Sequence, residues 1–418
     1  MSQELTAVTE LGEAEKLRKE LADQEKGSSQ QPDSSAGSQR STQGPFGYES
    51  KQQETAVLAE VGSGGFSMQD IELIQQLGRL SWVTESARED PLQVSRNTVE
   101  QQTAVIAFKG QYYSGLPFQD PVPVLLKEFL PGAKSVACNE LQTLVHLAEG
   151  LPASKWHAAR AAMSADLPIV PLLGYFWGAQ SNAGASVSAE EEKVLWLVYK
   201  FEKLQPLTYY AAAAQAQPTS GLGLWGSKST EEDELRDRCR MVRTICRGML
   251  QALSFCHKRG VAHGSFGPGS VMLSTFRDCQ ARELIVKLDN FGFAQMQKSS
   301  APGALYPSPQ ALDPDHPLSL AQQEDLKAAG LVVLETVICA LAEGGPSDAT
   351  SSAALQRLLF DVFGSDVHTF RKHCNQEQDW TLAAALLDEY NGWQLVSHLI
   401  SGQRSAQECL VNPFVFGV

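Results

Sequence analysis

The 418-residue sequence is short of positive charge, of long apolar runs and of paired cysteines. Its 34 lysines and arginines stand against 48 aspartates and glutamates, which gives a formal net charge of -14. Nucleic acids and anionic membranes both need a basic surface, so we expect neither as the main partner. No apolar run approaches the ~20 residues that cross a bilayer, so we expect no integral membrane segment.

The eight cysteines are scattered and include no C-x-x-C pair. Such spacing in a long chain is typical of reduced, buried thiols and not of a disulfide framework or a zinc site. We therefore expect a reducing intracellular compartment. The sequence is 43% hydrophobic and 20% charged, which is ordinary for a domain with a sizeable core.

The chain divides into an N-terminal tail and one large domain. In residues 1–62 one amphipathic stretch precedes a Ser/Gln/Gly-rich segment, so we expect an acidic tail that is partly helical and otherwise disordered. The domain spans residues 63–418. Its first part, about 70–202, contains strand-like runs and one helical pattern, whereas the rest, about 203–418, is mostly helical. This order predicts an α+β protein with two lobes.

One predicted strand carries a lysine among apolar residues. In VPVLLKEFL (122–130), alternation puts Leu125, Lys127 and Phe129 on one face. Burying an ammonium group is costly unless an anion pairs with it. The following helical pattern offers Glu140, which shares its inward face with Leu144. These residues alone leave a second interpretation open, in which Lys127 reaches solvent and Glu140 is an ordinary exposed residue.

Further segments, in order along the chain, resemble landmarks of Ser/Thr-type protein kinases. They are GVAHGSFGPGSVML (260–273) for the catalytic loop, VKLDNFGFA (286–294) for the D-F-G turn, YPSPQAL (306–312) for the A-P-E segment, QEDLKAAGLVVLETV (323–337) for a helix of the second lobe and RSAQECLVNPFVF (404–416) for the domain's end. The resemblance implies a two-lobed kinase-like fold, with an antiparallel sheet and one main helix before a mostly helical lobe. VLWLVYKFE and LLKEFLPGA are also similar to plant chloroplast kinases of thylakoid proteins, which makes the chloroplast an alternative to the cytoplasm.

The positions to which the resemblance assigns chemistry depart from the kinase pattern. Ser265 stands where kinases place the catalytic Asp, and a serine hydroxyl has no useful basicity near neutral pH. Ser270 replaces the magnesium-binding Asn of the loop, and Asn290 replaces the Asp of D-F-G, although a neutral amide is a poor ligand for a hard dication. Asp289 precedes Asn290, but neighbouring side chains of an extended segment point to opposite faces. We therefore expect no metal site, unless Asn290 or Asp289 supplies a ligand.

The nucleotide side of the implied site is altered too. GRLSWV (78–83) keeps only Gly78 of the glycine-rich loop, and Leu125 stands where kinases place an Ala against adenine. Lys127, Glu140 and Tyr199, the last in the gatekeeper place, complete the implied pocket. We expect ATP binding to be weak or absent, with ATP and Mg²⁺ as cofactors only if nucleotide binding is retained.

The packing positions of a kinase core are kept. By resemblance, Leu144, His263, Phe291 and Asp325 form the regulatory stack, and Arg404 near the end is the arginine that kinases pair with the A-P-E segment. His263 is accordingly expected to be a core histidine held by backbone hydrogen bonds, not an acid–base catalyst.

These observations leave three hypotheses for the function. The first is a pseudokinase that acts as a scaffold or allosteric regulator of a protein partner, with weak or no ATP binding. The second is an active ATP-dependent Ser/Thr kinase with non-standard catalytic residues, Asp289 among them. The third is another transferase on the same fold, because a fold does not determine its chemistry.

Overall fold

The computed structural model describes residues 66–83, 101–113, 120–148, 167–181, 193–216, 231–297, 318–342 and 350–416. All of them lie in one compact unit, Glu54–Val418. The expected tail and the segment YPSPQAL lie outside the described residues. Within them, no helix has the length and apolar character needed to cross a membrane. All eight cysteines are free thiols, and most of them are buried.

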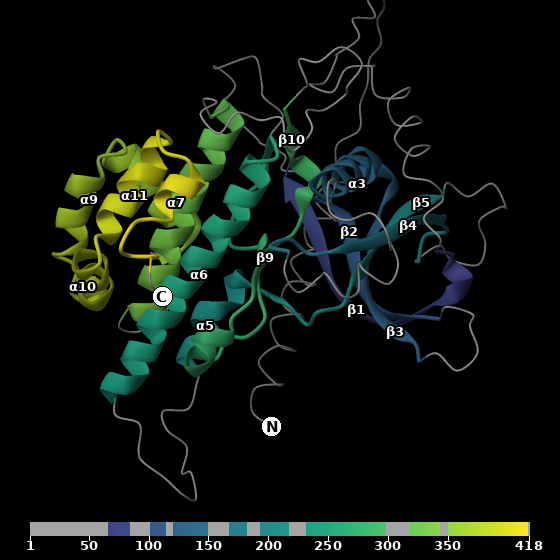
Figure 1. Cartoon of the computed structure of the whole chain (residues 1–418), viewed down its shortest axis with the longest axis horizontal. Coiled ribbons are helices and arrows are strands. Elements are labelled where there is room, and N and C mark those ends of the chain that lie inside the picture. The colour runs from purple at the N-terminus through teal and green to yellow at the C-terminus, as the bar shows by residue number, and fades with distance from the viewer. Residues whose placement is uncertain are drawn as a thin grey trace, which may run out of the picture. The chain divides into compact units, whose positions relative to one another are not determined.

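The first half is a five-stranded antiparallel sheet in the order β1-β2-β3-β5-β4 (Figure 1). Its strands are rich in the β-branched, aliphatic and aromatic residues that suit a pleated surface. They are β1 Ile71–Val83, β2 Gln101–Tyr112, β3 Val122–Phe129, β4 Leu172–Gly178 and β5 Val194–Lys200, preceded by the one-turn helix η2 Met68–Asp70. The long helix α3, Lys134–Ala148, follows β3 through the turn η3, Pro131–Ala133.

Apolar side chains cover both faces of the sheet. On one face, Val124 and Leu126 join a buried cluster that contains Trp196, whose ring stacks on Phe176 at 5.7 Å between centroids. On the other face, Phe129 joins the large cluster that includes the buried residues of α3. The alternation predicted for β3 is therefore confirmed, and the Lys127 face of the strand is the one that meets α3.

The second half is mostly helical. Its longest helices are α6, Glu231–His257, and α7, Leu320–Leu341, and α7 begins at a capping box in which Ser319 and Gln322 exchange side-chain and backbone hydrogen bonds. The other helices are α5 Tyr210–Gln215, α8 Ser352–Gln356, α9 Val367–Cys374, α10 Thr381–Glu389, α11 Gly392–Ser401 and α12 Ala406–Cys409, with the short helical turns η5 Leu207–Tyr209, η6 Asp278–Glu283, η7 Phe291–Phe293, η9 Arg357–Val362 and η10 Gln378–Trp380. Most residues of α7 are buried, so it is a central helix of this half.

Short strands lie where the sheet half meets the helical half. They are β6 Gln205–Pro206, β7 Val261–Ala262, β8 Val271–Leu273, β9 Val286–Leu288 and β10 Gln295–Met296. They form a three-stranded sheet, β6-β8-β9, and the pair β10-β7. The predicted α+β architecture is confirmed: an antiparallel sheet with one main helix precedes a mostly helical part, as in a two-lobed kinase-like fold.

The stretch matched to a glycine-rich loop is a strand instead. Residues 78–83 continue β1, and Gly78 is opposite Ala107 of β2. A methyl group added at Gly78 would meet no atom within 4 Å, so neither space nor backbone conformation requires glycine there. The connection from β1 to β2 falls on residues 84–100, outside the described residues.

Candidate functional site

Lys127 of β3 lies at the centre of a buried polar cluster. Its Nζ donates to Glu140 Oε1 of α3 at 2.8 Å, to Asp289 Oδ1 at 2.7 Å and to Asn290 Oδ1 at 2.9 Å. The side chains of Lys127 and Glu140 are only 3% and 4% exposed, so the interpretation in which they face solvent is wrong. An ammonium group has three N–H donors, and here each has an acceptor.

Tyr199 of β5 belongs to the same cluster. Its hydroxyl donates to Glu140 Oε1 at 2.6 Å, and its ring centroid lies 4.8 Å from Lys127 Nζ. Burial raises the pKa of Tyr199 well above its usual value, and the charges of Glu140 and Asp289 add to the effect. Tyr199 is therefore a neutral hydrogen-bond donor that holds the carboxylate of Glu140 in place.

The charge state of Lys127 depends on two opposing effects. Burial lowers its pKa, but the carboxylates of Asp289 and Glu140 together outweigh burial, so the pKa of Lys127 is raised above its usual value. Lys127 is thus a charged ammonium held between two acids. A single cation shared by two carboxylates makes the cluster depend on this one residue.

The expectation that Asp289 points away from Asn290 is wrong. Both side chains reach Lys127 Nζ, and the side chain of Asp289 is 8% exposed. Asn290 has a left-handed backbone conformation, with φ 66 and ψ 56, so the chain turns there. Alternation of side chains holds only for an extended strand, and this segment is not extended at Asn290.

His263 is a core histidine, as its neighbours show. Its Nε2 lies 2.9 Å from the carbonyl oxygen of Asp289, and because a carbonyl only accepts, Nε2 carries the proton. Nδ1 accepts from the backbone N–H of Ser265 at 3.4 Å. Burial lowers the pKa of His263, which keeps the ring neutral near pH 7. Both ring nitrogens are therefore engaged by the backbone.

Asp325 of α7 holds the loop that contains His263. Its carboxylate accepts the backbone N–H of His263 at 2.6 Å and that of Gly264 at 2.9 Å, and it lies 3.0 Å from Nε2 of His257. The ring of Phe291 lies 4.9 Å from the His263 ring. Leu144 of α3 is buried in the same core cluster as Phe291. The structure thus brings the four residues of the expected stack into one core.

A cavity of about 220 Å³ opens beside Lys127. Its described lining is Leu80, Val105, Lys127, Phe129, Val136, Glu140, Ser265, Asn290, Gly292 and Phe293. The cavity brings Lys127, Glu140, Ser265 and Asn290 together. Gly78, Leu125, Tyr199 and Ser270 are not among its lining residues.

The two serines of the loop differ in where they point. Ser270 is buried, and its hydroxyl donates to the carbonyl of Gly267 at 2.8 Å and accepts the Gly267 N–H at 3.1 Å. It therefore closes its own loop and does not line the cavity. Ser265 is exposed and does line the cavity.

Three expected positions are not among the residues that line the cavity. Gly78 is within β1, and Leu125 is half-buried in β3, opposite Lys109 and Tyr199. Arg404 is exposed, and its expected counterpart in YPSPQAL lies outside the described residues. Leu125 is therefore next to the cluster, through Tyr199, whereas the described contacts join neither Gly78 nor Arg404 to it.

Sequence reasoning missed residues that hold α3 against the turn after β9. Asn139 Nδ2 donates to the carbonyl oxygens of Gly292 and Ala294 at 3.0 and 2.9 Å. A Cβ at Gly292 would lie 2.2 Å from Cγ1 of Val136, so glycine allows the close approach of helix and turn. In the sequence, only the position of Asn139 next to Glu140 points to a role for it. That position does not distinguish Asn139 from an ordinary surface residue of the helix.

A second buried lysine was also missed. Lys287 of β9 is 1% exposed, and its Nζ lies 2.7 Å from Oε2 of Glu202, just after β5. The same pattern that identified Lys127, a lysine between apolar residues of a strand, recurs at Val286–Leu288. This pair ties the segment after the five-stranded sheet to the small sheet that leads into Asp289.

This arrangement is that of a kinase-like fold: Lys127 and Glu140 join the sheet to its main helix, and the helical part places the His263 loop and the Phe291 turn beside them. The sequence matches no protein-family model and no curated protein. Among the solved structures similar to it is a Stt7 homolog from Micromonas algae, from a crystal soaked with ATP. That structure has a TM-score of 0.47 and 18% sequence identity, over 85% of this chain and 95% of the other.

Proposed function

We propose that the chain is a kinase-like domain that does not transfer phosphate and acts as a scaffold or allosteric regulator of a protein partner. The observation that carries this proposal is the lining of the cavity beside Lys127. Glu140 is the one carboxylate in its described lining, and Glu140 is already paired with Lys127. Kinase chemistry needs one carboxylate to accept the substrate proton and others to hold magnesium.

The place of the catalytic base supports the same proposal. Ser265 has no basicity of its own, and a serine becomes reactive only when a neighbouring base takes its proton. His263 is the adjacent imidazole, but its Nε2 proton is donated to the Asp289 carbonyl and its Nδ1 accepts the Ser265 N–H. Neither nitrogen is available to the Ser265 hydroxyl.

The cavity also disfavours nucleotide. Its volume of about 220 Å³ is below the roughly 300–1,000 Å³ of common small-molecule sites. In kinases, the lysine at the position of Lys127 binds nucleotide phosphates. Here Lys127 already has three acceptors, so a phosphate would have to displace one of them. Weak binding or none is the expected result.

Asp289 favours a second candidate, an active kinase with rearranged ligands. Its carboxylate lies next to Asn290 and within 2.7 Å of Lys127, so a small shift would bring it to the cavity. In that case Asp289 would take the metal-binding role that Asn290 cannot fill. The two candidates make opposite predictions for magnesium-dependent ATP binding.

The test is a thermal-shift titration with ATP, with and without Mg²⁺, followed by transfer of labelled phosphate. Bound ligand stabilises by RT ln(1+[L]/Kd), about 2.7 kcal/mol at a hundredfold excess over Kd. At millimolar ATP we expect at most a small shift that does not depend on Mg²⁺, and no transfer, for the wild type. The variant S265D/N290D, assayed beside it, shows whether the fold accepts the missing groups.

A magnesium-dependent shift with label transfer in the wild type would support the active kinase, provided that Asp289→Asn abolishes both. Asp361→Asn is the matched control, because Asp361 is an exposed acid of η9 far along the chain from the cluster. If Asp361→Asn lost activity as well, the effect would not report on Asp289.

A further inference from the structure

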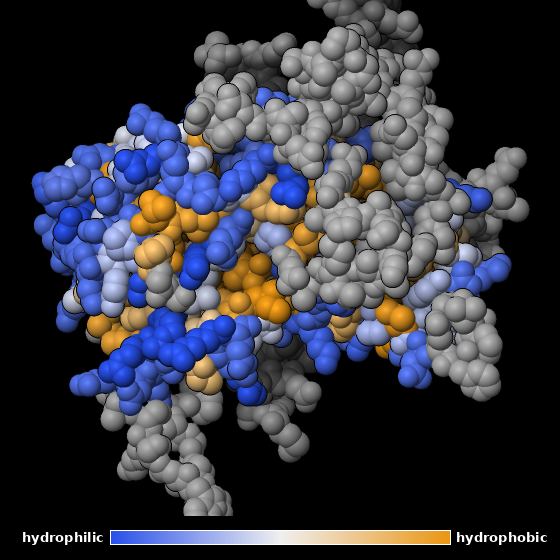
Figure 2. Space-filling model, in the orientation of Figure 1, coloured by the Kyte–Doolittle hydropathy of each residue, from blue (hydrophilic) through white to orange (hydrophobic). Residues whose placement is uncertain are grey.

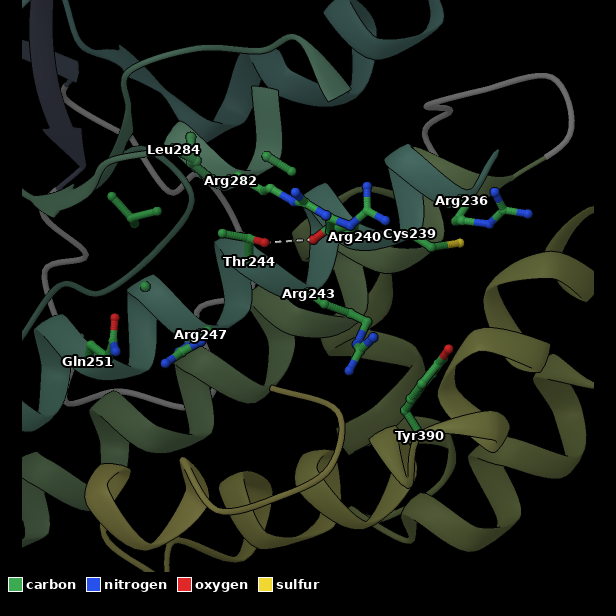
Figure 3. Close-up of a pocket in the computed structure, with 13 residues that line it drawn as sticks. Arg236, Cys239, Arg240, Arg243, Thr244, Arg247, Gln251, Arg282, Leu284 and Tyr390 are labelled. Carbon is green, nitrogen blue, oxygen red and sulfur yellow. Dashed lines mark hydrogen bonds between the residues drawn. The ribbon is translucent and has the colours of Figure 1, made fainter. Parts of the chain in front are cut away.

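Helix α6 presents a row of arginines. Arg236, Arg240, Arg243 and Arg247 are spaced by four, three and four residues, which places them on one face of the helix. Arg282 of η6 faces the same space from a different segment. The five arginines line a cavity of about 660 Å³ (Figure 3).

The described lining of this cavity contains no carboxylate. Besides the arginines it comprises Cys239, Thr244, Gly248, Gln251, Ala281, Leu284, Val286 and Tyr390. The whole chain has a formal net charge of -14, so a space surrounded by five guanidinium groups is a local exception to its acidic composition. The space-filling view shows strongly hydrophilic residues gathered over the N-terminal end of α6 (Figure 2).

Nearby acids neutralise part of this charge. Asp233 pairs with Arg236 at 2.7 Å and Asp237 with Arg240 at 2.6 Å, each within α6. Glu389 is a nearby charge for Arg243. Like charges at helical spacing repel each other, so an anion in the cavity would stabilise the row.

The walls of the cavity are fixed by other contacts. Arg243 donates to the carbonyl oxygens of Phe414 and Pro413 at 2.7 and 3.1 Å, and its guanidinium lies 3.9 Å from the ring centroid of Tyr390. A Cβ at Gly248 would lie 2.6 Å from Val286, so α6 packs closely on β9 at the cavity floor. Arg282 is exposed, and in the described part of the chain it has no hydrogen bond or ion pair.

We propose that this cavity binds a phosphate group carried by a phosphorylated side chain of a partner protein. A guanidinium group offers two parallel N–H donors that match two phosphate oxygens. A phosphorylated side chain carries close to two negative charges and three acceptor oxygens, so it can engage arginines from α6 and η6 at once. The inference is independent of whether the Lys127 site binds nucleotide.

The test measures binding of a fluorescent eight-residue peptide with one phosphoserine and no other charged side chain, at physiological salt. The unphosphorylated peptide, free O-phosphoserine and inorganic phosphate are the comparison probes. We expect the phosphopeptide to bind and its unphosphorylated form not to bind. Binding of the two free phosphates as tightly as the peptide would identify the source as a small phosphate compound and overturn the assignment to a partner protein.

Two double variants locate the site. R247Q/R282Q should weaken phosphopeptide binding at least roughly thirtyfold, because each arginine supplies a charge-assisted hydrogen bond. R357Q/K372Q removes the same charge from exposed positions outside the cavity and should change the affinity less than about twofold. Circular dichroism of both variants is the control for folding. Equal affinity for wild type and R247Q/R282Q, or equal losses in the two variants, would overturn the proposal.

Discussion

The buried layer of the Lys127 site and the layer that lines its cavity differ in how their polar groups are satisfied. In the buried layer every charge has a partner: Lys127 with Glu140 and Asp289, and Asp325 with the backbone of the His263 loop. Lys127 and Glu140 also line the cavity, but the other polar side chains of its described lining, Ser265 and Asn290, are neutral. A buried charge cannot lose its partner without a large loss of stability, whereas an exposed polar residue can be replaced at little cost. The fold should therefore tolerate substitutions at the neutral lining residues that it would not tolerate in the buried layer.

The largest effect is expected from removing the shared cation. Lys127→Met leaves Glu140 and Asp289 buried without a counter-ion, which should reduce the free energy of unfolding by about 3–5 kcal/mol in a urea titration. Ser265→Ala is the matched change in the lining layer and should stay within about 0.5 kcal/mol of the wild type. Similar losses in the two variants would show that the buried layer and the lining do not differ in their tolerance of substitution.

The next comparison is between two glycines, one in the loop that resembles the kinase catalytic loop and one in the stretch matched to the glycine-rich loop. Gly264 has φ +75, and an added Cβ would lie 2.1 Å from the Phe293 carbonyl oxygen, so Gly264→Ala should cost at least about 2 kcal/mol. Gly78→Ala meets no atom and should be neutral within about 0.5 kcal/mol. Thermal or urea unfolding measures both. A destabilising Gly78→Ala would mean that β1 is constrained by residues outside the described ones.

A smaller effect is expected at Tyr199. Tyr199→Phe keeps the ring beside Lys127 but removes the hydroxyl that donates to Glu140, a hydrogen bond to a charged group worth about 1.5–3 kcal/mol. Tyr210→Phe is a control of the same kind, because its hydroxyl donates to Asp278 in the helical half. Both variants should unfold more easily, but only Tyr199→Phe should also change the response of stability to Lys127→Met. Strict additivity of the Tyr199 and Lys127 effects would argue against a single coupled cluster.

The sequence predicted the fold and the centre of the site well, because both depend on local patterns. Alternation in β3 and helical spacing in α3 placed Lys127 and Glu140 on inward faces but left a solvent-exposed interpretation open, which their burial rules out. The prediction failed where the backbone leaves regular structure. Asp289 was expected to point away, but the left-handed conformation of Asn290 brings both side chains to Lys127.

Long-range packing explains the other differences. The engagement of Asn139 with the turn after β9 spans more than 150 residues of chain, and no local pattern encodes it. Residues 78–83 keep only Gly78 of the glycine-rich pattern, and they continue the strand β1 instead. The arginine row of α6 was visible in the sequence, but its meeting with Arg282 depends on how η6 packs against the helix.

The smallest expected effect is a pH dependence from His263 in the buried layer. Burial lowers the pKa of its ring below the usual 6.5. Above pH 6.5 the ring is neutral in both the folded and the unfolded chain, so it does not alter stability. As the pH falls below 6.5, the unfolded chain takes up the proton first, and stability falls by up to about 1.4 kcal/mol per pH unit until the folded pKa is reached.

The variant His263→Gln isolates this contribution, because glutamine retains an N–H donor for the Asp289 carbonyl and has no titrating group. Burial and then Arg404 also lower the pKa of His398, so a residual slope of the same sign is expected to remain in the variant. Urea titrations at pH 7, 6 and 5 should give a shallower loss for His263→Gln than for the wild type. Because the wild-type ring is neutral at pH 7, the two slopes should diverge only below pH 6.5. An equal dependence of stability on pH in the two proteins would mean that His263 is solvated or charged in the folded chain. The buried layer would then be more accessible to water than its hydrogen bonds imply.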